Sequence, residues 1–332
     1  MRAMVYKGPK TLEVEDFADP VPRAGDALIA IEAVGICGSD MHAWAGHDER
    51  RPAPLILGHE ASGLVLEGRL KGKRVAINPL VTCGRCNHCL GGRANLCIER
   101  QIISMPPRQG AFAERLAIPE GNLVEIPDGL DLAKAALTEP VATAWHAVVL
   151  AERHASRAPA EGRALVIGGG AVGLAAALVL GARGCRDITI AETNPGRRAT
   201  AARAGRFHVF DPLADPNAIA TGTMDIVLDA VGAKPTRGLA IRAARPGGVI
   251  VHIGLLDGVD GTDIRRLTLQ EIALVGCYTY TMVDFRAALA AIASGALGPL
   301  DWMTERPFAD GPTAFDDLAA GREAAAKIVL RL

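Results

Sequence analysis

The stretch Arg163–Gly173, with the sequence Arg-Ala-Leu-Val-Ile-Gly-Gly-Gly-Ala-Val-Gly, joins a short apolar run to a glycine-rich turn. An apolar segment of helical character follows from Leu174 to Arg183, and the next strand-like run, Asp187–Ala191, ends beside Glu192. Glycines in the pattern G-x-G-x-x-G let the chain turn tightly between a strand and a helix, and the N–H groups of the helix N-terminus can then bind a pyrophosphate. The stretch therefore predicts a dinucleotide-binding βαβ unit in an open parallel sheet.

Three later strand-like runs extend this unit: Met224–Asp229, Gly248–Ile253 and Ile272–Cys277. The residues expected to contact the dinucleotide are Gly168, Gly170, Ala171, Val172, Gly173, Glu192 and Arg197. The Glu192 carboxylate would accept hydrogen bonds from ribose hydroxyls and repel a 2′-phosphate, so NAD is expected rather than NADP. Arg197 and Arg198 lie just beyond Glu192 and could weaken that preference.

A second informative region lies upstream, where Gly35–His42 reads Gly-Ile-Cys-Gly-Ser-Asp-Met-His and Gly58–Glu60 reads Gly-His-Glu. Cys37, His59 and Glu60 combine sulfur, nitrogen and oxygen donors. Zinc accepts such a mixed set, which leaves one coordination position free for a substrate oxygen. The pattern therefore predicts a catalytic zinc rather than a closed structural one.

Ser39 and His42 lie between these donors in the sequence, close enough together to pass a proton from the substrate toward solvent. A purely structural interpretation stays open, in which Cys37 is a buried free thiol, His59 is a hydrogen-bonded core histidine, and Ser39 and His42 only cap the turn. Trp44 follows, and it either lines the pocket or belongs to the core.

The third motif is a loop in which four of the seven cysteines gather, at Cys83, Cys86, Cys89 and Cys97. Four thiolates at this spacing can close a tetrahedron, so a structural zinc is expected, with an iron–sulfur cluster as the alternative. The loop contains few apolar residues. A bound metal would therefore supply its folding free energy, on the order of 10 kcal/mol.

Composition sets wider limits. A chain of 332 residues with 49% hydrophobic residues can form about two domains, and its first part, residues 1–34, has the proline and glycine punctuation of an all-β opening. A net charge of −1 with scattered basic residues gives no reason to expect nucleic acid or an anionic membrane as a partner. The N-terminus lacks the apolar run of a signal peptide, so a cytoplasmic protein is expected.

With these motifs in order, the sequence resembles the zinc-dependent medium-chain alcohol and polyol dehydrogenases, and among them the sorbitol- and threonine-dehydrogenase-like members. The resemblance implies an α/β protein. A GroES-like β-barrel catalytic domain would span residues 1–140 and carry both zinc ions. A Rossmann NAD-binding domain with a doubly wound parallel sheet would span 141–277, and a C-terminal segment, 278–332, would return to the catalytic domain.

The resemblance also assigns roles to single residues. Cys37 and His59 match the catalytic zinc ligands of the family, and Glu60 matches a carboxylate that binds the metal in some members and sits behind it in others. No cysteine stands where the alcohol dehydrogenases proper have a third thiolate. Glu139, in Thr-Glu-Pro, matches the glutamate of the polyol branch. The connection between Ser62 and Val75 is shorter than in the family, which implies a clipped surface loop.

The activity that this resemblance implies is the NAD-dependent oxidation of a secondary alcohol or polyol to a ketone, in a homodimer or homotetramer with two zinc ions per chain. Two alternatives are a zinc-free quinone or enone reductase of the same superfamily and a non-catalytic nucleotide-binding zinc protein. The presence of Cys37, His59 and the four-cysteine loop argues against the first. The presence of Ser39 and His42 argues against the second.

Overall fold

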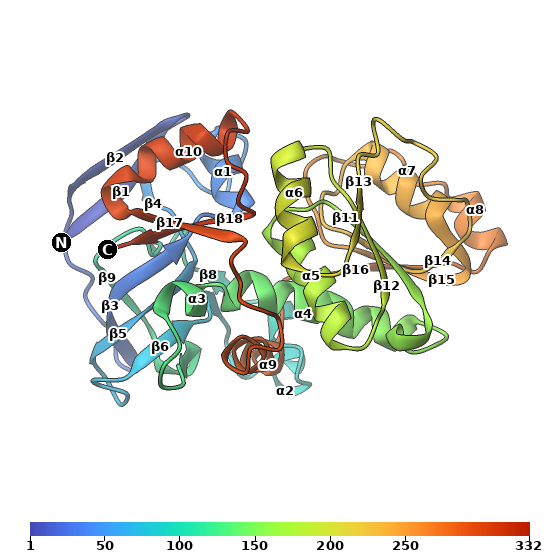
Figure 1. Ribbon diagram of the computed structural model, residues 1–332. Helices are drawn as coiled ribbons and strands as arrows, with labels where there is room; N and C mark the ends of the chain where they lie inside the picture. Colours follow the sequence, from blue (N-terminus) through green and yellow to red (C-terminus); the bar gives the residue numbers. More distant parts are fainter.

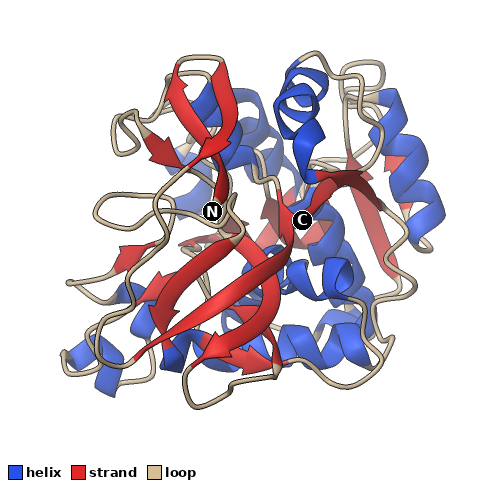
Figure 2. Ribbon diagram, turned by 90° about the vertical axis from the view of Figure 1, so that its left-hand side faces the viewer, coloured by secondary structure: helices blue, strands red, loops and turns tan.

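Helix α4 (Thr138–His154) joins two β-sheet bodies that stand side by side in the computed structural model, which describes residues 1–332 (Figure 1). The barrel half contains the N-terminal strands together with the last two strands of the chain, and the other half is an open parallel sheet flanked by helices. Both chain ends lie on the barrel half (Figure 2). No helix has both the length and the apolar content needed to span a bilayer.

The barrel half has two main sheets around one hydrophobic core. The strand β3 (Asp26–Gly35) is its centre, because β5 (Glu60–Glu67), β9 (Arg115–Pro119) and β18 (Lys327–Arg331) all pair with it. The other strands are β1 (Arg2–Gly8), β2 (Thr11–Asp16), β4 (Leu55–Ile56), β6 (Arg74–Ile77), β7 (Leu80–Val81), β8 (Gln101–Ile102), β10 (Leu123–Glu125) and β17 (Met303–Pro307). The predicted all-β opening is confirmed.

The second half is a sheet of six parallel strands in the order β13-β12-β11-β14-β15-β16. The strands are β11 (Arg163–Ile167), β12 (Asp187–Ala191), β13 (His208–Phe210), β14 (Met224–Asp229), β15 (Ala244–His252) and β16 (Ala273–Gly276). Strand order reverses between β11 and β14, so the carboxyl ends of these two strands frame the crevice in which such sheets bind ligands. The predicted doubly wound parallel sheet is confirmed.

Helices cover both halves. They are α1 (Gly38–Trp44), α2 (Asn87–Leu90), α3 (Leu132–Ala136), α5 (Ala171–Ala182), α6 (Pro195–Ala204), α7 (Lys234–Ala243), α8 (Ile264–Leu269), α9 (Met282–Ala293) and α10 (Gly311–Ala319). Short 3₁₀ turns are η1 (Ala94–Leu96), η2 (Glu120–Asn122), η3 (Pro159–Glu161) and η4 (Phe308–Asp310). Helix α9 packs against α4, where His146 Nδ1 lies 2.9 Å from Asp284 Oδ2.

One strand begins earlier than the sequence predicts. Strand β15 begins at Ala244, ahead of the expected Gly248, so it includes Pro246 and Gly247, which are typical of loops. Between the two halves the chain forms two consecutive helices, because α3 ends at Ala136 and α4 starts at Thr138. Pro140 is the third residue of α4. An N–H group in the first turn of a helix has no partner within the helix, so the proline removes no hydrogen bond there.

The side chain of Trp44 belongs to the barrel core. It is 5% exposed, and its ring centroid lies 6.1 Å from that of Phe315 on α10. Of the two roles that the sequence allowed for Trp44, the structure therefore supports the packing role.

Candidate active site and metal centres

The donors Cys37, His59 and Glu60 converge because two strands are paired. Cys37 follows β3 and is the N-cap of α1, while Glu60 begins β5, and the antiparallel register sets Glu60 opposite Gly35. One ligand atom from each of the three residues lies within 4.8 Å of the others. His59 and Glu60 are buried, and Cys37 is half-buried.

The surroundings of Glu60 fit a metal site. Its Oε1 accepts a hydrogen bond of 2.6 Å from the buried Lys327 Nζ, whereas its Oε2 is buried and has no hydrogen-bond partner. A side chain at Gly35 would overlap this carboxylate, so the glycine leaves the space that Glu60 fills. A buried carboxylate oxygen without a partner is costly unless a cation satisfies it.

His59 is also oriented for metal binding. Its Nδ1 lies 3.4 Å from Asp40 Oδ1 and 3.4 Å from Ser104 Oγ. These neighbours occupy one ring nitrogen and leave Nε2 as the ligand atom. Asp40 is fully buried and its carboxylate also accepts the backbone N–H groups of Cys37, at 3.0 Å, and Gly58, at 3.3 Å. A single carboxylate therefore links the two segments that carry the donors.

Glu139 lies in the first turn of α4, next to this cluster but outside the set of three converging atoms. The hydroxyl of Tyr280 donates to Glu139 Oε1 at 2.9 Å, and both side chains are buried. Burial raises the pKa of the Glu139 carboxyl to about 7, an effect that His59 opposes and the Glu60 carboxylate reinforces. Burial would lower the pKa of Lys327, but the charge of Glu60 raises it above the usual value, so this ammonium stays protonated.

Sequence reasoning missed Asp40, Lys327 and Tyr280. Asp40 stood inside the quoted motif, and an acid that follows a metal-binding cysteine by three residues was an available signal. Lys327 opens the apolar run Lys-Ile-Val-Leu, where a lone cation beside buried residues was the only hint. Tyr280 had no local signal, because its partner lies on a distant helix.

Ser39 and His42 both lie on α1, and both are half-buried. The guanidinium of Arg51 donates to the Ser39 backbone carbonyl at 2.8 Å and to its Oγ at 3.4 Å. No hydrogen bond joins Ser39 directly to His42. The structure therefore sets them on one face of a short helix with a gap that a cofactor hydroxyl or water would have to bridge.

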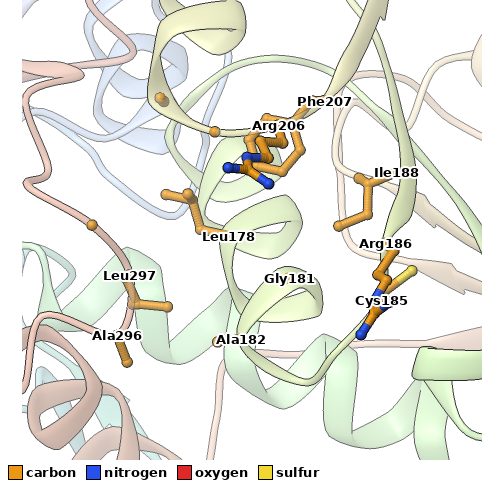
Figure 3. Close-up of a pocket in the computed structure, with 13 residues that line it drawn as sticks. Leu178, Gly181, Ala182, Cys185, Arg186, Ile188, Arg206, Phe207, Ala296 and Leu297 are labelled. Atoms are coloured by element: carbon orange, nitrogen blue, oxygen red, sulfur yellow. The ribbon is translucent and has the colours of Figure 1, made fainter.

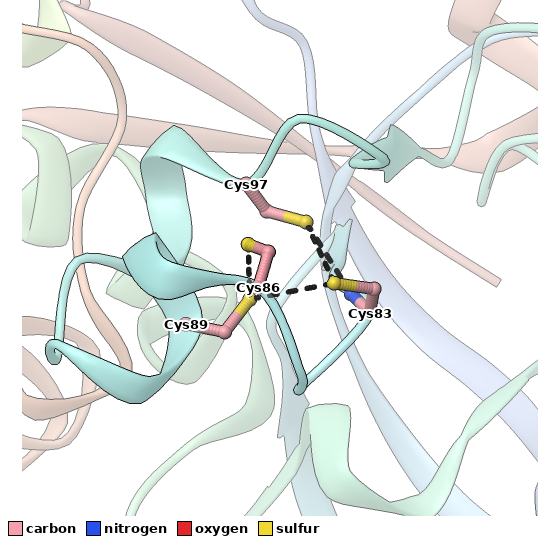
Figure 4. Close-up of side chains that lie close together, drawn as sticks. All are labelled: Cys83, Cys86, Cys89 and Cys97. Carbon is pink, nitrogen blue, oxygen red and sulfur yellow. Dashed lines mark hydrogen bonds between the residues drawn. The ribbon is translucent and has the colours of Figure 1, made fainter.

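The four cysteines of the second centre converge in one loop (Figure 4). The Sγ atoms of Cys83 and Cys97 are 3.5 Å apart, those of Cys86 and Cys89 are 3.6 Å apart, and those of Cys83 and Cys89 are 3.9 Å apart. Four thiolates around one tetrahedral zinc, each at about 2.3 Å, stand about 3.8 Å from one another. Backbone hydrogen bonds, first that of Cys89, lower the pKa of Cys86, whereas burial raises the pKa of Cys89, so one thiol of this pair ionises before the other. The loop is thus shaped for a tetrahedral metal.

The glycine-rich turn has the expected form. Gly168 has a φ of +99°, and a side chain at Gly173 would overlap the Gly168 carbonyl. The turn leads into α5, whose first residues are Ala171 and Val172, with Gly170 as the N-cap. The glycines of the turn therefore lie at the carboxyl end of β11, while Glu192 follows β12 and Arg197 lies on α6.

Glu192 contacts this turn directly. Its carboxylate accepts the backbone N–H of Gly169 at 2.7 Å and that of Asn194 at 2.7 Å. Of the two neighbouring arginines, Arg198 is already engaged, because its Nη1 lies 2.9 Å from Asp211 Oδ2. Arg197 differs, since its Nε is buried without a hydrogen-bond partner.

A cavity of about 660 Å³ lies elsewhere in the parallel-sheet half (Figure 3). It is bounded by the C-terminal end of α5, with Leu178 and Ala182, and by Phe207 and Leu297. This is the opposite end of α5 from the glycine-rich turn, and none of the candidate site residues lines it. Its size therefore does not mark it as the active site.

Comparison with known proteins identifies the family. Residues 23–128 match the alcohol dehydrogenase GroES-like domain, and residues 171–294 match the zinc-binding dehydrogenase family. The chain belongs to the zinc-binding dehydrogenases. This dehydrogenase is 33% identical over 322 residues to L-galactonate-5-dehydrogenase from Escherichia coli (strain K12), covering 93% of this chain and 92% of that one.

Two further relatives agree. The dehydrogenase is 30% identical over 342 residues to D-xylulose reductase A from Aspergillus oryzae (strain ATCC 42149 / RIB 40), covering 96% of this chain and 94% of that one. It superposes with a TM-score of 0.89 and 28% identity on a zinc-binding dehydrogenase from Sinorhizobium meliloti 1021 bound to NADP, covering 100% of this chain and 99% of that one.

These matches confirm the resemblance to the medium-chain alcohol and polyol dehydrogenases. They also confirm the pairing of a GroES-like barrel with a Rossmann sheet. The dehydrogenase is an oxidoreductase that acts on CH–OH groups and uses zinc and a nicotinamide dinucleotide.

Proposed function

We propose that the cluster around Cys37 oxidises a secondary alcohol of a polyol or sugar-derived substrate to a ketone, with NAD as the hydride acceptor. The observation that carries this proposal is the buried, unpartnered Glu60 Oε2 beside Cys37 and His59, in a set of donors that leaves room for a substrate oxygen. The names of the relatives, an L-galactonate dehydrogenase and a D-xylulose reductase, support a polyhydroxylated substrate.

In this proposal, Cys37 and His59 hold the catalytic zinc, with Glu60 or Glu139 as the third protein ligand, and the four-cysteine loop holds a second zinc. When bound, zinc supplies a Lewis acid that eases loss of the alcohol proton, and the nicotinamide supplies the hydride acceptor. Glu139 is suited to exchange with Glu60 because both carboxylates are buried in the same cluster and the charge of each acts on the other.

The chain's own residues then move the proton. The Ser39 hydroxyl would accept the proton of the substrate alcohol and donate its own proton toward the His42 imidazole, with a hydroxyl or a water between the two residues as the bridge. His42 is half-buried on α1 and would pass the proton to solvent at the outer end of this path.

NAD is proposed as the preferred cofactor because the Glu192 carboxylate stands at the carboxyl end of β12, where the adenosine ribose binds in this fold. Arg198 is paired with Asp211 and is poorly placed to attract a 2′-phosphate. The test is kcat/KM with each cofactor. Equal values, or a preference for NADP, would refute the assignment of Glu192.

We further propose the domain division given by the sequence, a cytoplasmic location and a homo-oligomer. Strand β16 supports the oligomer, because it is the sheet edge and pairs only with β15 on one side. Leu274 on this strand is 44% exposed. Pairing of β16 with that of a second copy would satisfy its free N–H and C=O groups. Sedimentation velocity measures the assembly, and Leu274→Lys should shift it toward the monomer.

The experiment that tests the function is oxidation of a panel of polyols, sugar acids, amino alcohols and simple secondary alcohols with NAD.

The proton path is tested by substitution. Ser39→Ala should lower kcat by roughly 10²- to 10⁴-fold while zinc content is kept. His42→Ala should cost less, because water can replace the outer member of the chain. His47→Ala is the control, since this exposed imidazole follows α1 without facing the cluster. A normal kcat for Ser39→Ala at pH 7 would overturn the proton path.

A further inference from the structure

Arg51 is a buried arginine beside the catalytic cluster. Only 2% of its side chain is exposed, whereas the side chain of Arg50, the neighbouring residue, is 64% exposed. Buried guanidinium groups are rare unless their N–H groups are satisfied by acceptors. The contacts of Arg51 therefore indicate what this charge does inside the protein.

Every nitrogen of the Arg51 guanidinium has an acceptor. Nε donates to the Ser104 carbonyl at 3.0 Å, and Nη1 donates to the Ser39 carbonyl at 2.8 Å and to Asp48 Oδ2 at 3.1 Å. Nη2 donates to the Ser39 hydroxyl oxygen at 3.4 Å. Asp48 balances the charge, so the remaining donors hold Ser39 from both its backbone and its side chain.

The contact with Arg51 fixes the direction in which the Ser39 hydroxyl accepts and donates hydrogen bonds. A hydroxyl has one O–H to donate and two lone pairs to accept with, and a guanidinium can only donate. When Arg51 fills one lone pair, the other lone pair is left for an incoming proton, and the O–H is left for onward donation. Because arginine keeps its proton at any working pH, Arg51 cannot take the proton out of this path.

The Arg51 guanidinium also contacts Ser104, which is a neighbour of the metal-ligand candidate His59. Ser104, whose carbonyl accepts from Arg51, has its hydroxyl 3.4 Å from His59 Nδ1. Ser104 also has a φ of +69°, a conformation that a residue with a side chain rarely adopts unless its surroundings impose it. Arg51 therefore joins the loop behind His59 to the start of helix α1.

We propose that Arg51 is a positioning residue for proton transfer, which holds the Ser39 hydroxyl so that it accepts from the substrate and donates outward. This inference rests on the proton path proposed above. In the step, the O–H bond of the substrate alcohol breaks and a new O–H bond forms at Ser39. The former Ser39 proton passes to a ribose hydroxyl of bound NAD or to water and then to His42, while the hydride goes to NAD.

The test compares Arg51→Met with Arg50→Met. Met keeps the unbranched apolar stem of the side chain but lacks the guanidinium and cannot donate. Arg51→Met should lower kcat at pH 7 by about 10- to 100-fold, the range typical of groups that orient a reacting residue. The deficit should shrink steadily toward pH 10, because hydroxide then takes the substrate proton without the serine. Arg50 shares Asp48 as a partner but does not contact Ser39, so Arg50→Met should keep the normal pH profile.

A double-mutant comparison separates this inference from the proton path itself. In a Ser39→Ala background, Arg51→Met should cause little further loss of kcat, because the hydroxyl that it positions is gone. The role of Arg51 would be overturned if the fold-losses in kcat of the two single variants multiply in the double variant. It would also be overturned if the loss of kcat in Arg51→Met is the same at every pH. Normal kcat in Ser39→Ala alone would instead overturn the proton path.

Two further readouts do not depend on steady-state activity. Metal analysis should find the zinc content of Arg51→Met unchanged, and an indicator dye in a single turnover should show slowed proton release. If Arg51→Met does not fold, Arg51→Lys keeps the pair with Asp48 but loses the planar fork that reaches Ser39. It should show the same pH-dependent deficit, and a normal kcat at pH 7 in Arg51→Lys would overturn the proposal.

Discussion

The two cysteine-containing centres are built in opposite ways. The four-cysteine centre draws all its donors from one loop between Cys83 and Cys97, and most of them are half-buried. The cluster at Cys37 draws its donors and their partners from α1, β5, α4 and β18, and most of its members are buried. We therefore expect the first centre to need its metal to fold, and the second to be held by the fold before any metal binds. The two centres should therefore respond differently to loss of a ligand.

The largest expected effect is on the catalytic side. Cys37→Ala should lower kcat by at least about 10⁴-fold, equivalent to about 5.5 kcal/mol. Its free energy of unfolding should change by less than about 2 kcal/mol, because the neighbouring side chains keep their contacts. Metal analysis should find one zinc per chain. Cys277→Ala is the control, since this half-buried thiol belongs to neither centre. Loss of both zinc ions in Cys37→Ala would contradict the expectation that the two centres bind metal independently.

Loss of a cysteine from the four-cysteine loop should lower the stability of the protein more than its catalytic activity. Cys97→Ser removes the one fully buried thiol of the four-cysteine loop, and the free energy of unfolding should fall by about 4 kcal/mol, as is typical when a structural metal is lost. The catalytic zinc should remain. Denaturant unfolding with metal analysis measures both quantities. An unchanged unfolding midpoint would mean that the loop is held by its protein contacts and not by its metal.

Glu139 gives a pH test of the preformed cluster. In protein stripped of metal, its folded-state pKa of about 7 exceeds the unfolded value of 4.5, so the folded state binds the extra proton. Stability should then fall as pH rises from about 4.5 to about 7, by up to about 3 kcal/mol. Glu139→Gln should remove this slope.

The same substitution in zinc-loaded enzyme should lower kcat by about 10- to 100-fold, as expected for a carboxylate near the metal. An identical pH slope of stability in wild type and Glu139→Gln would show that this carboxyl is not buried as described. Unchanged kcat and zinc content would remove Glu139 from the site.

The smallest expected effect concerns the link between the two centres. Asn95, in the four-cysteine loop, donates through Nδ2 to the Tyr278 carbonyl at 2.9 Å, and Tyr280 follows two residues later. Asn95→Ala should cost about 1 kcal/mol of stability and change kcat by less than about twofold. In the double variant Asn95→Ala/Tyr280→Phe, the two losses in the free energy of unfolding should add to within about 0.5 kcal/mol if the two centres are independent. Asn87→Ala, at an exposed position of the same loop, is the control.

This contrast also explains what the sequence could reveal. The four-cysteine loop and the glycine-rich turn were predictable because their donors and turns are neighbours along the chain, and local spacing fixes their geometry. Cys37, His59 and Glu60 were predictable as a set only because each lies in a recognisable short motif. Lys327 and Tyr280 were not predictable, since they reach Glu60 and Glu139 only through the pairing of β18 with β3 and the packing beside α4. Trp44 shows the reverse case, in which closeness in sequence to the site did not bring a side chain into it.

The bond between Lys327 and Glu60 joins residues that are 267 positions apart. At a synthesis rate of about 5–20 residues per second, roughly 15 to 50 s separate the appearance of the two side chains on a ribosome. During that interval Glu60 has no ammonium partner, and β3 lacks the strand β18 that pairs with it. A nascent chain that has already made all four cysteines of its local loop is therefore still unable to complete its catalytic cluster, and the enzyme becomes competent only when its last strand emerges.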